Sequence, residues 1–551
     1  MSRFNHQKYR PFAFAPHLPD RTWPDKTITK APTWVSVDLR DGNQALIDPM
    51  TIEQKLRFFQ LLVDCGFKEI EIGFPSASQI EYDFTRLLIE GGHIPDDVTI
   101  QVLVQAREHL IDRTFESLRG VKRAIVHLYN PTSRVQREKV YEKSKEDITA
   151  IAVAGATLLQ ERAARYPDSE WIFEYSPESF SQTETDFAVA VCEAVCRVWQ
   201  PWAGRKVILN LPNTVEACTP NRYADQIEYF CRHLGCREHI TLSVHTHNDR
   251  GCAVAAGELA VMAGADRVEG TLLGNGERTG NMDIMVMAMN LYSQGVDPEL
   301  DFSRMNDIVR IVSECNNLPV HPRHPYIGEL VFTAFSGSHQ DAIKKSLEKP
   351  QEDGIWDIAY LPIDPLDIGR SYQDVVRINS QSGKGGVAYI LARDYGLNVP
   401  RWLQIDFAQH VQKESERTQK ELSSRDIITL FEDSYLHDSP LHLDDYAIRR
   451  LERQDHHLEA NLTRTDGSSI ILKGHGGGAM GAFIDALQQH SGKRISVANY
   501  AEHAMSKTTD AQAVAYVQLM IDDALHTGIA YSQDTVSAML RATLVAAGHI
   551  L

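Results

Sequence analysis

Two histidines separated by a single residue are the first positions in this chain whose spacing suggests chemistry. His245 and His247 stand in the segment HTHND, at the end of an apolar run. Alternate side chains of a strand point to the same face, so both imidazoles would lie on one side of a predicted strand. Paired imidazoles suit a divalent metal, although such a pair also occurs by chance on surfaces. The position at a strand end favours the metal-ligand role.

Asp41 and Asn281 are the candidates for further ligands. Asp41 lies in the segment LRDGNQ behind the first apolar run, and Asn281 ends the glycine-rich segment GNGERTGN at 274–281. Two imidazoles and one carboxylate with open positions are typical of a catalytic metal site, to which Asn281 would add a neutral oxygen. The alternative for Asp41 is a turn or helix cap. The glycine-rich segment suits anion binding at a helix start, and equally a tight turn.

The elements that must position these residues form eight apolar runs, each followed by enough chain for a helix. The runs cover residues 35–39, 69–74, 99–104, 123–129, 171–177, 206–212, 240–247 and 267–274. This alternation predicts an α/β fold with a TIM (β/α)8 barrel, in which the first strand lies beside the eighth and functional residues gather at the carboxyl ends. An open doubly wound sheet is the alternative, but its GxGxxG signature is absent after the first strand.

A capping-box pattern supports the helical reading of the first crossover. Thr51 and Gln54 have the spacing of that motif, and Leu56, Phe59 and Leu62 follow at helical intervals. We therefore expect a helix between the first two strands.

Several other polar residues lie near the ends of the runs. They are His127, Glu174, Glu178, Asn210 and Thr214. Taken singly, each is expected to be a hydrogen-bonded barrel residue rather than a catalyst. Glu71, in the second run, is expected either to face the barrel mouth or to form a core ion pair with an arginine.

The chain is long enough for several domains. We expect an N-terminal extension (1–33), a catalytic barrel (34–322), a linking subdomain (323–426) and a C-terminal domain (427–551). The last part alternates strand-like stretches with helical ones, which predicts a separate α+β module with a hint of internal pseudo-symmetry. The strand-like stretches are 446–453, 457–463, 468–473, 494–505 and 511–520, and the helical ones are 477–490 and 533–547.

Charge and cysteine usage narrow the functional classes. The chain carries 56 Lys and Arg against 74 Asp and Glu, a net charge of −18, which argues against nucleic acid and membrane surfaces as partners. An anionic substrate therefore needs a local cluster of arginine, metal or backbone N–H groups. The eight cysteines include no CxxC pair, and neither a long apolar run nor an export signal is present. We expect a cytoplasmic protein.

The segments LRDGNQ, HTHND and GNGERTGN resemble the 2-isopropylmalate synthases of the DRE-TIM metallolyase group. The likeness extends to FPSASQ (74–79), EYSPESF (174–180), LPNTVE (211–216), GSHQD (337–341) and NSQSGKGG (379–386). With these segments the chain resembles the longer of the two types of these enzymes. The resemblance spans nearly the whole chain.

The resemblance implies roles for individual residues. The implied metal ligands are Asp41, His245, His247 and Asn281. Arg40 and Thr214 would orient a 2-oxo acid, and His127 would line its pocket.

The implied catalytic residues come from two subunits. They are Arg40, Glu178, His339 and Tyr372. His339 and Tyr372 would reach the barrel mouth of a partner subunit, where Glu178 is the neighbouring carboxylate, so a homodimer with shared active sites is expected. Glu178 and His339 are the candidates for acid–base work.

The reaction implied by the resemblance condenses acetyl-CoA with 2-oxoisovalerate and water to 2-isopropylmalate and CoA, the first committed step of leucine biosynthesis. The implied cofactor is a divalent metal (Mg²⁺, Mn²⁺ or Zn²⁺), and an assisting monovalent cation such as K⁺ is left open. The C-terminal domain would bind leucine as an inhibitor. Within the segment GHGGG at 474–478, Gly476, Gly477 and Gly478 are the effector candidates, with an ordinary glycine hinge as the alternative.

Two alternatives stay open at this point. A homocitrate or citramalate synthase would share the barrel and the metal, because one or two methyl groups of an oxo acid contribute little binding energy. A catalytically silent leucine sensor would keep the scaffold without the chemistry.

Overall fold

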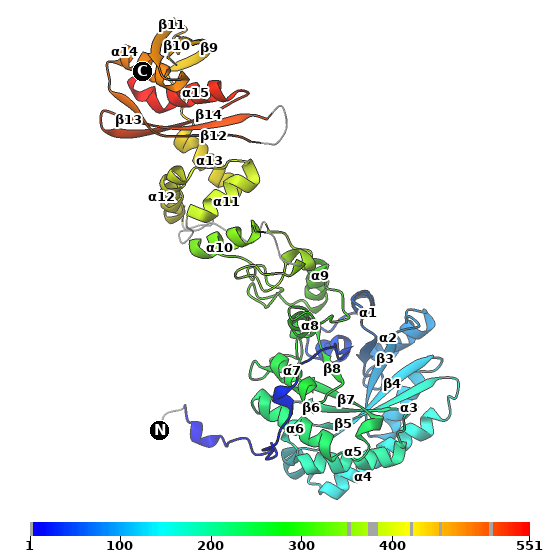
Figure 1. The fold of residues 1–551 in the computed structure, drawn as a ribbon. Coiled ribbons are helices and arrows are strands. Elements are labelled where there is room, and N and C mark those ends of the chain that lie inside the picture. The colour runs from blue at the N-terminus through cyan, green and yellow to red at the C-terminus, as the bar shows by residue number, and fades with distance from the viewer. Residues whose placement is uncertain (1–3, 350–353, 373–383, 419–421, 451–454, 506–510) are drawn as a thin grey trace. The chain divides into compact units, whose positions relative to one another are not determined.

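The computed structural model describes the chain except for residues 1–3, 350–353, 373–383, 419–421, 451–454 and 506–510 (Figure 1). Most of the motif at 379–386 therefore lies outside the described residues. The chain forms two compact units, which we describe separately. The first comprises residues 1–331 and 365–370, and the second comprises residues 332–364 and 371–551. The predicted boundaries at 322 and 426 remain predictions.

Eight parallel strands of the first unit close into a barrel in sequence order, so the predicted TIM-like fold is confirmed. The strands are β1 (Thr33–Ser36), β2 (Glu69–Gly73), β3 (Thr99–Gln105), β4 (Arg123–Pro131), β5 (Glu170–Glu178), β6 (Val207–Asn213), β7 (Ile240–Thr246) and β8 (Arg267–Gly270). β1 pairs with β2 on one side and with β8 on the other. The residues that follow the carboxyl ends of β1, β7 and β8 are thereby brought to one side of the barrel mouth.

Helices follow the barrel strands and surround the barrel (Figure 1). They are α1 (Ile52–Asp64), α2 (Gln79–Glu90), α3 (Glu108–Ser117), α4 (Lys145–Ala163), α5 (Thr185–Trp199), α6 (Pro220–His233), α7 (Ala253–Ala263) and α8 (Ile284–Tyr292). A further helix, α9 (Met305–Asn316), follows α8 and contacts α1. The capping box predicted at Thr51 and Gln54 is present at the start of α1. No helix among the described residues is long and apolar enough to cross a lipid bilayer.

In its described part, the second unit contains four α-helices followed by the C-terminal module. The helices are α10 (Gly337–Leu347), α11 (Lys384–Tyr395), α12 (Arg401–Thr418) and α13 (Ser424–Tyr435). The module consists of β9 (Leu441–Arg450), β10 (His456–Arg464), β11 (Ser469–Gly476), α14 (Ala479–Ser491), β12 (Ile495–Ala504), β13 (Ala513–Ile521), β14 (Ala524–Ser532) and α15 (Thr535–Ala547). The α+β prediction is confirmed.

The module is built from two similar halves, each with three antiparallel strands and one helix. The sheets have the orders β11-β10-β9 and β12-β13-β14, and both helices share one apolar core with them. The same packing device occurs in both halves. A Cβ at Gly474 would lie 2.1 Å from the Ala482 carbonyl oxygen of α14, and a Cβ at Gly528 would lie 2.3 Å from the Ala542 carbonyl oxygen of α15. Only glycine lets strand and helix approach this closely.

The sequence prediction missed one strand and displaced another. β14 was not predicted, because its segment ALHTGIAYS lacks a continuous apolar run or clear alternation. β9 begins five residues before the predicted stretch 446–453, and residues 451–453 of that stretch lie outside the described residues. Pairing with β10 turns the polar start of β9 into a strand.

Candidate active site

Asp41 is carried by a π-helical turn, Asp38–Gly42, which follows β1 directly. The Val37 carbonyl accepts hydrogen bonds from the N–H groups of Arg40 (3.2 Å), Asp41 (2.9 Å) and Gly42 (3.1 Å). The buried Asp38 carboxylate accepts the Leu272 N–H at 3.1 Å, which ties this turn to the loop behind β8. The strand predicted at 35–39 therefore ends earlier, at Ser36, and a tight turn follows that aims Asp41 at the barrel mouth.

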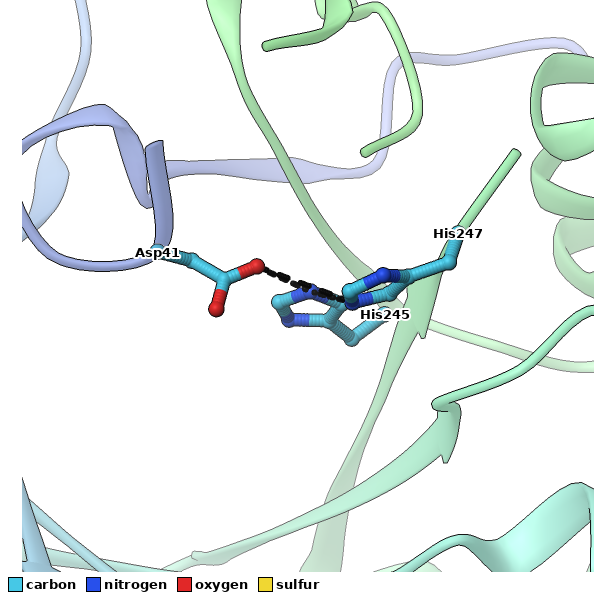
Figure 2. Close-up of side chains that lie close together, drawn as sticks. All are labelled: Asp41, His245 and His247. Atoms are coloured by element: carbon cyan, nitrogen blue, oxygen red, sulfur yellow. Dashed lines mark hydrogen bonds and ion pairs between the residues drawn. The ribbon is translucent and has the colours of Figure 1, made fainter. Parts of the chain in front are cut away.

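The two strand-seven imidazoles meet Asp41 at this mouth. Figure 2 shows the three side chains pointing toward one another. Asp41 Oδ2 lies 3.5 Å from His245 Nε2 and 3.6 Å from His247 Nε2, and the two Nε2 atoms are 3.1 Å apart. All three residues are buried. The predicted convergence of these side chains is thus present in the structure.

The donor and acceptor pattern around His245 fits a cation. Glu269 Oε2 lies 2.8 Å from His245 Nδ1, which places a proton on Nδ1 and leaves the Nε2 lone pair facing the mouth. Asn281 Oδ1 lies 2.7 Å from that Nε2, while the Asn281 amide nitrogen donates to the Asn275 carbonyl. Asp41 Oδ2 is buried and has no hydrogen-bond partner among the described residues. Three acceptor atoms therefore face one another, an arrangement that a divalent cation would satisfy.

The ionisation of these groups follows from their burial and their neighbours. Burial alone would raise the pKa of Asp41, but the Arg40 guanidinium and the two imidazoles hold it well below its usual range. Burial disfavours a charged His245, but the Asp41 and Glu269 carboxylates outweigh it and raise its pKa to about 10. Burial and the neighbouring His245 lower the pKa of His247 to about 3. Without a metal, a proton on His245 partly neutralises the site.

Arg40 joins the metal candidates to the barrel interior. Its Nη1 lies 2.5 Å from Asp41 Oδ1, and its Nε lies 2.5 Å from Glu71 Oε2. Glu71 is fully buried and pairs with Arg40, which is the second of the two expected alternatives, the ion pair with an arginine. His127 Nδ1 lies 3.3 Å from Glu71 Oε1, and His127 Nε2 lies 2.7 Å from the Ser176 hydroxyl. These contacts fix the orientation of Arg40 and His127.

A second acidic group lies near His127. His127, Glu174 and Glu269 also bring potential ligand atoms together. Arg267, which is fully buried, already pairs with Glu174 at 3.3 Å and with Glu269 at 2.8 Å. A cation is therefore already present in this cluster, and we assign it a structural role.

A cavity of about 260 Å³ opens above the Asp41, His245 and His247 group. Its lining contains Arg40, Asp41, Gln44, Leu103, His127, Tyr129, Ser176, Glu178, Asn210, Pro212, Thr214, His245, His247, Glu277 and Arg278. Burial raises the pKa of Glu178, and Arg40 lowers it only in part. Thr214 accepts the Ser179 N–H at 2.9 Å through its hydroxyl oxygen. Five sequence candidates outside the metal group line this one cavity: Arg40, His127, Glu178, Asn210 and Thr214.

The other candidates lie in the second unit. The His339 ring stacks on Tyr360 with centroids 4.1 Å apart, and the Tyr372 hydroxyl donates to Asp364 at 3.0 Å. Gly476 ends β11, and a Cβ there would lie 2.5 Å from the Ala482 nitrogen, so this glycine is required for packing. Nothing lies within 4 Å of a Cβ at Gly477 or Gly478.

Sequence reasoning did not single out Glu269, Leu103, Tyr129 or Arg278. Glu269 orients His245, and Leu103 and Tyr129 form apolar surface in the cavity. Arg278 Nη2 lies 2.9 Å from His247 Nδ1, and its Nε lies 2.7 Å from Asp249. For Glu269 the sequence did contain a signal, the charged residues Arg267 and Glu269 within an apolar strand. Because alternate residues of a barrel strand face the same side, both of these side chains point into the barrel.

Comparisons with known proteins place these features in context. Residues 31–312 match the family model HMGL-like, residues 329–392 match "Alpha-isopropylmalate synthase, post-catalytic domain-like", and residues 421–551 match "LeuA allosteric (dimerisation) domain". The chain is 54% identical over 551 residues to the 2-isopropylmalate synthase of Alcanivorax borkumensis, which covers 99% of this chain and 98% of that protein. It is 53% identical to that of Azotobacter vinelandii, covering 99% and 97% of the two chains, and 55% identical over 516 residues to that of Ralstonia nicotianae, covering 93% and 89%.

The closed barrel and the first of these matches define an HMGL-like barrel enzyme. The full-length relatives narrow the assignment further. The chain belongs to the 2-isopropylmalate synthase family, and it is an acyltransferase of the Claisen type. This finding disfavours the alternative of a catalytically silent sensor.

We expect His245→Ala and Asp41→Ala each to lose the metal and to lower turnover about a hundredfold or more, since each removes a charge or lone pair from the convergent group. The metal content after dialysis, measured by mass spectrometry, and the circular dichroism spectrum test this. His109→Ala, at an exposed position of α3, is the matched control. Stoichiometric metal retained by both site variants would contradict the assignment.

Proposed function

We propose that this enzyme is a 2-isopropylmalate synthase that condenses acetyl-CoA with 2-oxoisovalerate and water to 2-isopropylmalate and CoA. The observation that carries the proposal is the convergence of Asp41, His245 and His247 below a small cavity, in a chain that is similar to named synthases over its full length. In metabolism, this reaction would be the first committed step of leucine biosynthesis.

Asp41, His245, His247 and Asn281 would hold a divalent cation, Mg²⁺, Mn²⁺ or Zn²⁺. Their facing acceptor atoms support this. When bound, the cation would polarise the ketone of the 2-oxo acid and favour attack at its carbonyl carbon. Glu269 would keep His245 in the tautomer that binds a metal.

Three residues of the cavity would bind and orient the 2-oxo acid. Arg40 would attract the carboxylate, His127 would line the pocket, and Thr214 would offer its hydroxyl. Leu103, Pro212 and Tyr129 provide apolar surface for a branched alkyl group. Both cavity arginines are paired with carboxylates, Arg40 with Asp41 and Arg278 with Asp249. A second substrate carboxylate would therefore lack a cation, which favours 2-oxoisovalerate over 2-oxoglutarate.

Glu178 is the proposed base. Its raised pKa makes its carboxylate a better proton acceptor than an exposed glutamate. It would take a proton from the acetyl methyl group, whose carbon then forms the new bond to the keto carbon. The π electrons of the keto C=O bond move to its oxygen, which takes up a proton and becomes the hydroxyl group of the product. Water would subsequently cleave the thioester, and CoA would leave as the thiol. Because this hydrolysis follows the condensation, the overall reaction runs in one direction.

His339 and Tyr372 would act at the barrel mouth of a second subunit, with His339 as a further acid–base group. The match of residues 421–551 to a dimerisation domain supports a homodimer. This arrangement would make each active site depend on two chains.

The C-terminal module would bind leucine and inhibit the barrel enzyme. The match to an allosteric domain supports this proposal. A second support is the start of α14, because the N-cap residue Gly478 has no side chain to accept hydrogen bonds from the first N–H groups of the helix. Backbone N–H groups there could donate hydrogen bonds to the effector carboxylate. We also propose a cytoplasmic location, which the free thiol state of all eight cysteines supports.

We expect the kcat/KM for 2-oxoisovalerate to exceed that for pyruvate and for 2-oxoglutarate at least about tenfold, because the apolar wall contacts the additional methyl groups and no unpaired cation faces a second carboxylate. Release of the CoA thiol from acetyl-CoA measures this, with a reaction lacking oxo acid as the blank. A higher value for pyruvate or for 2-oxoglutarate would replace the proposal by a citramalate or homocitrate synthase.

Shared active sites predict complementation between inactive chains. Asp41→Ala and His339→Ala homodimers should be inactive, whereas their co-expression should restore about a quarter of wild-type activity, because half of the dimers are mixed and hold one intact site. Co-expression of Asp41→Ala with His245→Ala is the matched control, since both changes affect the same barrel and leave no site intact. Equal activity in the two mixtures would contradict shared sites.

We expect Gly478→Glu to raise the leucine concentration for half-inhibition about tenfold or more, because a carboxylate at the start of α14 repels the effector carboxylate. The side chain is sterically allowed, since Gly478 is extended and nothing lies near its Cβ. Activity without leucine should not change. Ser491→Glu, at the other end of α14, is the control. Unchanged inhibition of Gly478→Glu would place the effector elsewhere.

A further inference from the structure

Two histidines of the C-terminal module face each other across neighbouring strands. His457 of β10 and His475 of β11 are direct partners in the antiparallel register, and their ring centroids lie 4.6 Å apart at an angle of 36°. Directly paired side chains of a sheet point to the same face. Leu458 and Ala460 of β10 belong to the apolar core, so alternation places both histidine rings on the outer face of this sheet.

One ring nitrogen of this pair lacks a partner. His457 Nδ1 is buried and makes no hydrogen bond to any described residue. His503 of the same module is different, because its Nδ1 lies 3.1 Å from the Ala504 carbonyl oxygen and its Nε2 lies 3.1 Å from the Tyr516 hydroxyl. A buried polar nitrogen without a partner costs free energy. The pair is therefore a place where a bound ligand would satisfy the protein.

A carboxylate lies on the same face of the sheet. Glu459 follows His457 by two residues, and its carboxylate pairs with Lys473 of β11 at 3.0 Å. The Glu459 and Lys473 side chains are 38% and 56% exposed, and an ion pair with this exposure contributes little to stability. The carboxylate can therefore turn toward a cation at the two rings. Arg449, the neighbour of His457 on β9, is exposed, so its long side chain can extend its charge into solvent.

The spacing of the rings suits a single metal ion. With Zn–N bonds of about 2.1 Å, two imidazoles on one tetrahedral zinc ion have their centroids roughly 5 Å apart. The observed 4.6 Å requires only a small rotation of the rings to reach that geometry. Imidazole nitrogens favour Zn²⁺, Cu²⁺ and Ni²⁺, whereas Mg²⁺ favours oxygen ligands.

We infer that His457 and His475 bind a transition-metal ion of the zinc type, with Glu459 as the third ligand. This site belongs to the C-terminal module and is distinct from the metal candidates of the barrel. The inference goes beyond the proposed function and does not depend on it. His475 belongs to the segment GHGGG at 474–478, so the bound ion would link β10 to β11 next to the effector candidates Gly476, Gly477 and Gly478.

Equilibrium dialysis of the full-length enzyme against Zn²⁺, followed by metal analysis with mass spectrometry, tests the site. The double variant His457→Gln/His475→Gln should retain about one zinc ion fewer per chain than the wild type, because both imidazoles are lost. The barrel site contributes equally to both proteins. His437→Gln/His442→Gln is the matched control, because it removes two exposed histidines of the same unit, and His442 pairs with Thr463 at the other end of the sheet.

Two further variants separate ligation from general damage. The single variant His475→Gln changes an exposed position and should lose the same zinc ion without affecting the fold, which circular dichroism checks. Lys473→Gln should lower the dissociation constant of this zinc roughly threefold, because it releases Glu459 from its ion pair. An unchanged dissociation constant in Lys473→Gln would remove Glu459 from the ligand set.

Three results would overturn the zinc site itself: full zinc content in the double variant, an equal loss in the control, or displacement of this zinc by an excess of Mg²⁺. Turnover without leucine should stay at the wild-type level in the double variant, since neither histidine lines the active-site cavity. The zinc measurement needs no turnover, so a failure of the proposed function would leave its result unchanged.

Discussion

The structure of the catalytic unit depends on one electrostatic constraint, the convergence of acceptor atoms that need a proton or a cation between them. Asp41 Oδ2, His245 Nε2 and Asn281 Oδ1 face one another at the barrel mouth, where burial removes the water that would otherwise solvate them. Such a group is costly unless a proton or a metal lies at its centre. The surrounding fold is arranged to hold these atoms in place, because a relaxed arrangement would separate them.

The supporting contacts come from residues beyond the ligand candidates. The Asp38 carboxylate ties the turn that carries Asp41 to the loop behind β8, and Glu269 orients His245. Arg267 compensates the buried Glu174 and Glu269 inside the barrel. Buried ion pairs of this kind add little net stability compared with apolar packing, so we assign them chiefly to positioning. The closed barrel thereby positions the site more firmly than surface loops alone would.

Two cavities of the barrel unit meet at Glu178, which lines both of them. One is small and contains the metal candidates, and the other is larger and has cations at its rim. A carboxylate at their junction can reach a group that enters from either side, which is what a condensation between two substrates needs. The C-terminal module repeats one strand and helix pattern twice, with a glycine at the closest approach in each half. Two equivalent halves are a suitable scaffold for a symmetric dimer.

The sequence by itself determined the barrel, because eight apolar runs at regular spacing leave few other ways to bury them. It also determined the metal candidates, because Asp41 follows the first run and the two histidines end the seventh. Only the tertiary structure decided the turn at Asp38–Gly42, the strand β14, and the roles of Glu269, Leu103 and Tyr129. Local patterns cannot predict these features, because each depends on a partner far away in the chain. A side chain inside a barrel becomes a ligand support, a cavity wall or a core ion pair only when closure brings that partner within contact distance.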